Sequence, residues 1–150
     1  MNARKKAKVL GDFDDYDKST ISDESTEFKT DDLYKWLADT GTTSHITNRR
    51  DAFSTYQTLP RIPISGVGKL NTFGIARGTV YVHSECDGKP YVLQLNNVLH
   101  VPKNRNNLLS LGRWEAQHKR KIHIDDGRLT LQTNDGTSVA QGKRLGNNLY

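Results

Sequence analysis

The strongest constraint on the fold is a series of turn sequences that divide the chain into short apolar or alternating runs. An Asp-Gly pair closes three of these turns, at residues 85–88, 125–127 and 134–136. Such a pair between two alternating runs is typical of a tight β-hairpin, because both residues tolerate positive φ. The pattern predicts an all-β fold, a barrel or sandwich of short strands. The expected strands are 35–38, 62–64, 72–83, 89–95, 97–101, 107–111, 121–124, 128–132 and 137–140, with one helix over 111–119.

The first 32 residues differ in composition from the rest of the chain. They hold six Lys or Arg and nine Asp or Glu, whereas the remainder holds sixteen and eight, which gives it a net charge of +8. The apolar residues of the first segment show no sustained period, so it buries too little surface to offset the entropy lost on ordering. We expect residues 1–32 to be a disordered linker and residues 33–150 to be one β-barrel domain, cut from a longer polypeptide.

Composition argues against several classes of protein. No run approaches the ~20 apolar residues of a membrane span, and the basic N-terminus lacks the apolar stretch of a secretory signal. One cysteine, Cys86, excludes an internal disulfide and a multi-cysteine zinc site. Its place beside Asp87-Gly88 predicts exposure at a hairpin tip. A cytosolic or nuclear protein is the expectation from composition.

The most informative stretch for function begins at an apolar strand that leads into Asp39-Thr40-Gly41. The pattern indicates a carboxylate at the end of a buried strand, where the backbone turns sharply. Gly41 would permit a conformation that a side chain hinders, and the Thr40 hydroxyl would bond a neighbouring carbonyl. On the residues alone an ordinary turn stays open, because Asp-Thr-Gly is also common there.

Acid-base chemistry at such a site needs a second carboxylate. Two carboxylates about 3 Å apart share one proton, so that one serves as base and the other as acid. The chain contains Asp-Thr-Gly once. If the chain is an aspartic protease, the second Asp comes from an identical chain, and we expect a two-fold homodimer with the site on its axis.

Four stretches follow one another in a distinctive order. They read WLADTGTTSHIT at 36–47, ISGVG at 64–68 with GIARGTV at 74–80, LNNVLHVP at 95–102, and NNLLSL at 106–111. Together they resemble the protease region of copia-type LTR retrotransposon polyproteins. The resemblance implies a retropepsin-like closed β-barrel with one short helix, a homodimeric aspartic endopeptidase that processes its own polyprotein. The final residues 148–150 resemble the start of the segment that leads into integrase.

The resemblance also implies roles for individual residues. Asp39 would be the catalytic carboxylate, and Thr40 and Gly41 would form the loop that orients it. Gly66 and Gly68 would lie in a hairpin that closes over the peptide as a flap, since glycine can move and lets two backbones approach. An extended peptide would then bind by strand-like main-chain hydrogen bonds.

A second apolar strand would lie beneath the Asp loop. Leu108 and Leu109 would form it. Many retropepsins have an apolar-apolar-Gly sequence there, and this chain leaves open whether Ser110 or Gly112 takes the place of that glycine.

The expected mechanism needs no metal and no organic cofactor. The expected partners are a second copy of the chain and a polypeptide substrate, its own polyprotein, with weak nucleic-acid contact through a basic face and no membrane contact. The location would be the cytoplasm, within a virus-like particle if the element is active.

Other candidate residues have simpler interpretations. His45 is expected to be a hydrogen-bonded structural residue, because no second ligand lies at zinc spacing. His83, Cys86 and His100 are scattered and do not predict a metal site. The basic run 118–121 is expected to be a solvated face.

Two rival functions remain from the sequence. The barrel could be a catalytically inactive or domesticated retrotransposon-derived module for structure or interaction, because a fold does not guarantee its activity. It could instead be a basic nucleic-acid-binding barrel, for which the +8 charge of residues 33–150 is the argument.

Overall fold

The described part of the chain is mostly β with one short α-helix, as the sequence predicts. The computed structural model describes residues 8–10, 35–65, 72–117, 119–146 and 149–150. The elements are β1 (Lys8–Leu10), β2 (Trp36–Asp39), β3 (Ile46–Thr47), a 3-10 helix (Arg50–Ala52), β4 (Gln57–Pro63), β5 (Phe73–Cys86), β6 (Lys89–His100), β7 (Asn107–Ser110), α1 (Leu111–Ala116), β8 (Lys121–Asp125), β9 (Arg128–Gln132) and β10 (Ser138–Lys143).

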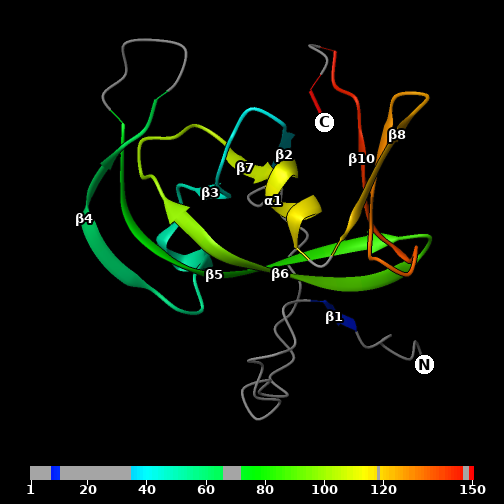
Figure 1. Cartoon of the computed structure of the whole chain (residues 1–150), viewed down its shortest axis with the longest axis horizontal. Helices are drawn as coiled ribbons and strands as arrows, with labels where there is room; N and C mark the ends of the chain where they lie inside the picture. The colour runs from blue at the N-terminus through cyan, green and yellow to red at the C-terminus, as the bar shows by residue number, and fades with distance from the viewer. Residues whose placement is uncertain (1–7, 11–34, 66–71, 118, 147–148) are drawn as a thin grey trace.

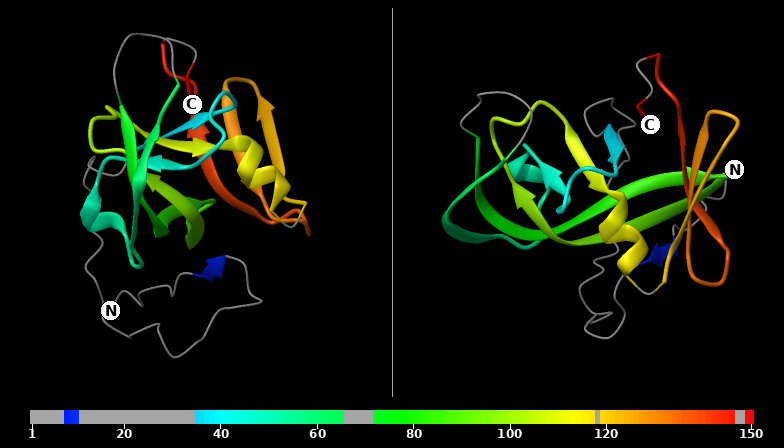
Figure 2. Two further views of the ribbon diagram at one scale, coloured as in Figure 1. Left: turned by 60° about the vertical axis from the view of Figure 1, so that its left-hand side comes forward. Right: turned by 45° about the horizontal axis from the view of Figure 1, so that its top comes forward.

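Seven strands form the larger of two sheets. Their order is β2-β7-β3-β6-β5-β4, and β1 also pairs with β6. The long strands β5 and β6 extend along the whole length of the molecule (Figure 1). β2, β3, β7 and α1 lie together on one side of them. β8, β9 and β10 form a separate antiparallel sheet in the order β10-β9-β8. This small sheet stands across one end of β5 and β6 (Figure 2).

In the part of the chain that the structure describes, the strands do not close into a barrel, so the predicted closed barrel is wrong. Among the described residues the ladder of the large sheet ends at β2 on one side and at β4 on the other. Pro60 and Pro63 lie in β4 and lack the N–H that a further strand would need, which restricts β4 to an edge. At the other edge, the amide of Ala38 in β2 donates to the carbonyl of Tyr150 at 2.7 Å. The C-terminal residue thus covers part of that edge.

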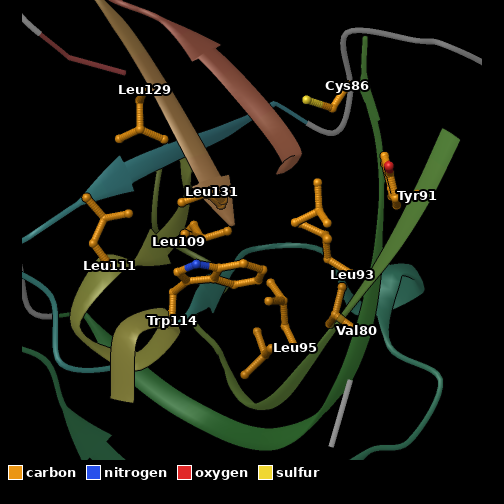
Figure 3. Close-up of a cluster of buried hydrophobic side chains, with 12 residues drawn as sticks. Val80, Cys86, Tyr91, Leu93, Leu95, Leu109, Leu111, Trp114, Leu129 and Leu131 are labelled. Carbon is orange, nitrogen blue, oxygen red and sulfur yellow. The ribbon is translucent and has the colours of Figure 1, made fainter. Parts of the chain in front are cut away.

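The hydrophobic core lies between the two sheets and α1. Trp114 of α1 is fully buried at its centre, among leucines from β6, β7 and β9 (Figure 3). Its indole Nε1–H donates to the carbonyl of Lys121 at 3.2 Å, which satisfies the polar end of the ring. The buried members are Val80, Cys86, Tyr91, Leu93, Leu95, Val98, Leu109, Leu111, Trp114, Leu129, Leu131 and Val139.

The predicted hairpin turns are confirmed at β5–β6 and β8–β9. Asp87 and Gly88 have φ of 52° and 72°, and Asp126 and Gly127 have φ of 45° and 69°. Consecutive positive φ values are what a two-residue hairpin turn with the right twist requires. The predicted strands 89–95 and 97–101 are instead one strand, β6. Asn97, with φ of 53°, sits at a bulge within it that shifts the register to β5.

The expected disordered linker is described at one place only. Lys8–Leu10 forms β1 and pairs in parallel with residues 91–93 of β6, so these three residues belong to the sheet. The rest of residues 1–32 lies outside the described residues. Within the described part of the chain, no helix has the length and apolar character needed to cross a membrane.

Candidate functional site

The loop that carries the Asp-Thr-Gly sequence crosses over the end of β7. β2 runs parallel to β7, with Asp39 opposite Ser110, whereas β3 runs antiparallel to β7, with Ile46 opposite Leu108. The chain therefore runs along β2 toward the end of β7 and crosses over that end in residues 40–45. It then returns along β3 in the opposite direction, so that β7 lies between the two strands. Because α1 starts where β7 ends, the crossing loop lies beside both the last residue of β7 and the first turn of α1.

Asp39 is held by the turn that it begins. It is half-buried, and its Oδ1 accepts a hydrogen bond of 2.7 Å from the amide of Gly41. A carboxylate that bonds the backbone two residues further on closes a local turn and fixes its own rotamer. The side chain is thus held at the tip of β2, where one oxygen is engaged by the protein's own backbone.

Two details of this turn differ from the sequence interpretation. Gly41 does not have a positive φ, so the turn does not need the backbone freedom of glycine. What it needs at this position is the absence of a side chain. A Cβ at this position would lie 3.2 Å from Oδ1 of Asp39 and crowd the carboxylate. Thr40 is exposed, and its hydroxyl has no hydrogen-bond partner among the described residues. The threonine that braces the loop is Thr42, whose hydroxyl donates to the carbonyl of Ser44 at 2.9 Å.

The far side of the loop is tied to β7 and α1 by side chains. The Ser110 hydroxyl donates to the carbonyl of Thr42 at 2.7 Å, and Nε of Arg113 donates to the carbonyl of Thr43 at 3.0 Å. Ser110 is also the N-cap of α1, since its Oγ accepts from the amide of Arg113 at 3.2 Å. From the sequence, Ser110 was considered only as a replacement for the glycine under the Asp loop, and neither loop contact was predicted. A serine just before the expected helix was the signal for the cap, but the loop contact depends on the tertiary fold.

His45 ends the loop as a buried structural residue. It is 1% exposed, and its Nδ1 accepts a hydrogen bond of 3.0 Å from the amide of Ser110. A neutral ring that accepts at Nδ1 carries its proton on Nε2. Burial, followed by the charges of Arg113 and Arg120, lowers the pKa of His45 to about 4. The imidazole is therefore neutral at pH 7 and serves as an acceptor.

The register of β2 and β7 decides which residue lies beside Asp39. Leu108 lies opposite Leu37, Leu109 opposite Ala38, and Ser110 opposite Asp39. Because strand residues alternate in direction, Leu109 enters the main core while Leu108 is only half-buried, against the smaller cluster around Ile46. Ser110, not Gly112, stands next to the aspartate.

The expected flap residues Gly66 and Gly68 lie outside the described residues. Their stem is described: β4 and β5 are antiparallel neighbours, and the amide of Ile64 donates to the carbonyl of Thr72 at 3.0 Å. Residues 66–71 thus connect two strands of one hairpin. The stem is tightly packed at Gly78, where an added Cβ would lie 1.9 Å from the carbonyl oxygen of Thr55.

A polar cluster below the loop joins β3, β7 and the residue that precedes β2. The Thr47 hydroxyl of β3 donates to Oδ1 of Asn107 at 2.7 Å, and Nδ2 of Asn107 donates to the carbonyl of Lys35 at 3.1 Å. Thr47 is 1% and Asn107 6% exposed. Nothing in the sequence indicated this role of Asn107, because its partners are 60 and 72 residues away.

The remaining candidate residues do not form a site. Cys86 is 2% exposed and belongs to the main core, so its predicted exposure is wrong: the tip of the hairpin is Asp87-Gly88, and Cys86 faces inward as the last residue of β5. His100 at the other end of β6 is bonded to the Tyr56 hydroxyl at 2.7 Å. In the part of the chain that the structure describes, no cluster of three or more His, Cys, Asp or Glu side chains could hold a metal ion.

The basic run 118–121 is not a uniform exposed face. Arg120 is 5% exposed and lies over the Trp114 ring, with its Cζ 4.5 Å from the ring centroid. Its Nη1 donates to the side-chain oxygen of Gln117 at 3.1 Å. Lys119 and Lys121 are exposed. The guanidinium therefore packs on the core as a cation–π pair.

The sequence of the chain also matches a known protein family. A family model described as "Pol polyprotein, beta-barrel domain" matches residues 36–120. The chain belongs to this family. No curated protein and no solved structure matches the chain. The match to the Pol polyprotein beta-barrel domain runs from β2 to just before β8, so it contains the whole Asp39 loop and its supports and stops short of the three-stranded sheet.

Proposed function

We propose that this Pol polyprotein beta-barrel domain is an aspartic endopeptidase of the copia type, with a retropepsin-like active site that is completed by a second copy of the chain. The observation that carries the proposal is the placement of Asp39. It stands at the tip of β2 in a turn closed by its own carboxylate, and the loop behind it is tied to β7 and α1. A carboxylate that is positioned in this way suits proton transfer, which depends on geometry first.

The chemistry would be shared between two copies of Asp39. One carboxylate, ionised, would take a proton from a water molecule as that water attacks the scissile carbonyl. The other, protonated, would donate a hydrogen bond to the carbonyl oxygen and later a proton to the departing amine. Two carboxylates that face each other across a two-fold axis hold one proton between them, which keeps one acid and one base. These steps involve only groups of the two chains and water.

The peptide would lie beneath the β4–β5 hairpin. β4 is an edge strand whose loop to β5 contains Gly66 and Gly68. The substrate proposed is the polyprotein itself, bound as an extended peptide by strand-like main-chain hydrogen bonds. If the retrotransposon is active, the site of action would be the cytoplasm, within a virus-like particle.

Precursor processing tests the proposal. A longer precursor that carries this domain would be followed across pH 4–7 as wild type, as Asp39→Asn and as Asp87→Asn. The matched control Asp87 is an exposed aspartate in the β5–β6 turn, where asparagine also tolerates positive φ. We expect wild type and Asp87→Asn to be processed and Asp39→Asn to remain intact.

Three results would argue against the proposal. Equal processing of wild type and Asp39→Asn would exclude Asp39 chemistry. No processing of a folded, dimeric wild-type precursor would favour the inactive structural module. Salt-dependent nucleic-acid binding that Asp39→Asn retains, and that neutralising Lys119 and Lys121 abolishes, would favour the nucleic-acid-binding barrel.

A further inference from the structure

Ser110 is the point at which β7, α1 and the Asp39 loop meet. Its side chain is completely buried, although the loop residues above it are partly exposed. Each of its polar groups that faces the loop has a defined partner. The amide donates to Nδ1 of His45, the hydroxyl donates to the carbonyl of Thr42, and the hydroxyl oxygen accepts from the amide of Arg113.

These partners leave one arrangement for the hydroxyl proton. The oxygen of Ser110 accepts from Arg113, so its single proton points to the carbonyl of Thr42. The imidazole of His45 has to accept from the amide of Ser110, because that amide is a donor only. The hydroxyl is thus oriented by its surroundings before any substrate arrives, and a glycine or alanine in this place would supply the amide alone.

The contact to Thr42 acts on the segment that sets the position of Asp39. Ser110 stands opposite Asp39 in the register of β2 and β7. The carboxylate of Asp39 bonds the amide of Gly41, and Thr42 is the next residue. A displacement of Thr42 therefore moves the amide that holds the carboxylate.

We propose that Ser110 is a positioning residue for Asp39, which acts by holding the carbonyl of Thr42 with its hydroxyl while His45 holds its amide. This inference rests on the proposed protease function. It assigns the residue a role beyond the helix cap. The cap alone would require only the acceptor oxygen of Ser110, whereas the contact to Thr42 requires its proton.

The test compares variants that keep or remove the hydroxyl proton. The 150-residue chain would act in trans on the Asp39→Asn precursor as substrate, as wild type and as the Ser110→Ala, Ser110→Thr and Ser84→Ala variants. Ser84→Ala is the matched control, since the Ser84 hydroxyl donates to the carbonyl of Val139 at 2.5 Å between β5 and β10, in another part of the molecule. Rates would be normalised to the folded fraction. If Ser110→Ala does not fold, Ser110→Cys replaces it, because a thiol keeps the volume but is a weak donor.

We expect Ser110→Ala to lower kcat by about tenfold to a hundredfold with little change in KM, since a small misplacement of a reacting group costs rate rather than binding. The two limbs of its bell-shaped pH–rate profile should also approach each other, because two carboxylates that move apart interact less. Ser110→Thr should restore kcat, and Ser84→Ala should match wild type. Wild-type kcat or an unchanged pH profile in Ser110→Ala would overturn the inference.

A second measurement tests the role of Ser110 even if the chain proves not to be a protease. If the wild-type chain does not cut the precursor, amide hydrogen exchange still measures how firmly Ser110 holds the turn. Faster exchange at Gly41 in Ser110→Ala, but not in Ser84→Ala, would support the positioning role of the hydroxyl. Equal exchange in wild type and Ser110→Ala would overturn it.

Discussion

The imidazole of His45 accepts a hydrogen bond from the amide of Ser110 at 3.0 Å, across 65 residues of sequence. This bond exists only while Nδ1 is unprotonated. A protonated ring would present a second donor to the amide, and it would place a positive charge in a buried site near Arg113 and Arg120. The contact that fixes the end of the Asp39 loop is therefore sensitive to acid.

The stability of the protein should fall as the pH is lowered from about 6.5 to about 4. The pKa of His45 is lowered to about 4 by burial and by the charges of Arg113 and Arg120, while the unfolded chain keeps the ordinary value of 6.5. Within this window the unfolded state binds a proton that the native state does not, so acid favours unfolding. The share of His45 in this loss amounts to about 3 kcal/mol. Urea denaturation at pH 7, 5.5 and 4 measures it.

Two variants assign this slope to His45. His45→Gln removes this titrating ring and should make the pH dependence shallower, from a lower starting stability. Burial also lowers the pKa of His83 and of His100, so part of the slope should remain. His123→Gln alters an exposed histidine of β8 and should keep the wild-type slope. The same slope in His45→Gln as in wild type would refute the assignment.

If the proposed protease function holds, Gly41→Ala should impair processing more than it impairs stability. The added Cβ would lie 3.2 Å from Oδ1 of Asp39, so either the carboxylate or the loop has to shift. We expect processing to fall by about tenfold or more, with a change in unfolding free energy of less than about 1 kcal/mol because the position is exposed. Precursor cleavage and urea denaturation measure the two effects.

The control for Gly41 is the glycine of α1. A Cβ on Gly112 would have no atom within 4 Å. Gly112→Ala should keep full processing and stabilise α1 by about 0.5–1 kcal/mol, since alanine is the better helix former. If Gly41→Ala processes the precursor like Gly112→Ala, crowding of the carboxylate is not important.

The features of the fold that depend only on residues close together in the sequence were predicted correctly. The Asp-Gly turns at 87–88 and 126–127, the strands beside them and the start of α1 follow from local chemistry, and the structure has them. Closure of the barrel depends on whether the two outermost strands meet, which no local pattern encodes. The burial of Cys86 was missed because its side chain follows the alternation of β5 rather than the exposure of the turn.

In the candidate site, too, the local feature could be predicted from the sequence and the long-range contacts could not. The position of Asp39 at the end of a strand was readable from the apolar run before it. The supports of its loop were not, because Ser110 and Arg113 reach it across about seventy residues of chain. Only the pairing of β7 between β2 and β3 brings them there, and that pairing is a property of the whole fold.

Asn107→Leu should be strongly destabilising. It removes the acceptor of the Thr47 hydroxyl, a buried contact between β3 and β7, and the donor to the carbonyl of Lys35, a part-buried contact beside β2. A buried hydroxyl or carbonyl without its partner costs about 1–3 kcal/mol, so we expect a loss of at least about 2 kcal/mol in urea denaturation. The exposed Asn134 in the β9–β10 turn is the control, and Asn134→Ala should change the free energy by less than about 0.5 kcal/mol.

A second substitution tests the reason for that loss. Thr47→Val in the Asn107→Leu background removes the hydroxyl that was left without an acceptor. The double variant should lose less than the sum of the two single variants, because both ends of the contact are then apolar. Strict additivity would show that packing, rather than the unpaired hydroxyl, determines the cost.

Cys86 should resist alkylation in the native protein. Its side chain is 2% exposed, and burial, with the neighbouring Asp87 carboxylate, raises the pKa of the thiol. The reactive thiolate is therefore both scarce and inaccessible. We expect iodoacetamide at pH 8 to label native Cys86 at least about a hundredfold more slowly than the chain in urea, as followed by mass spectrometry. Asp87→Asn removes the charge but not the burial, so it should restore only a small part of the rate. Native labelling as fast as in urea would mean that the end of β5 is open to solvent.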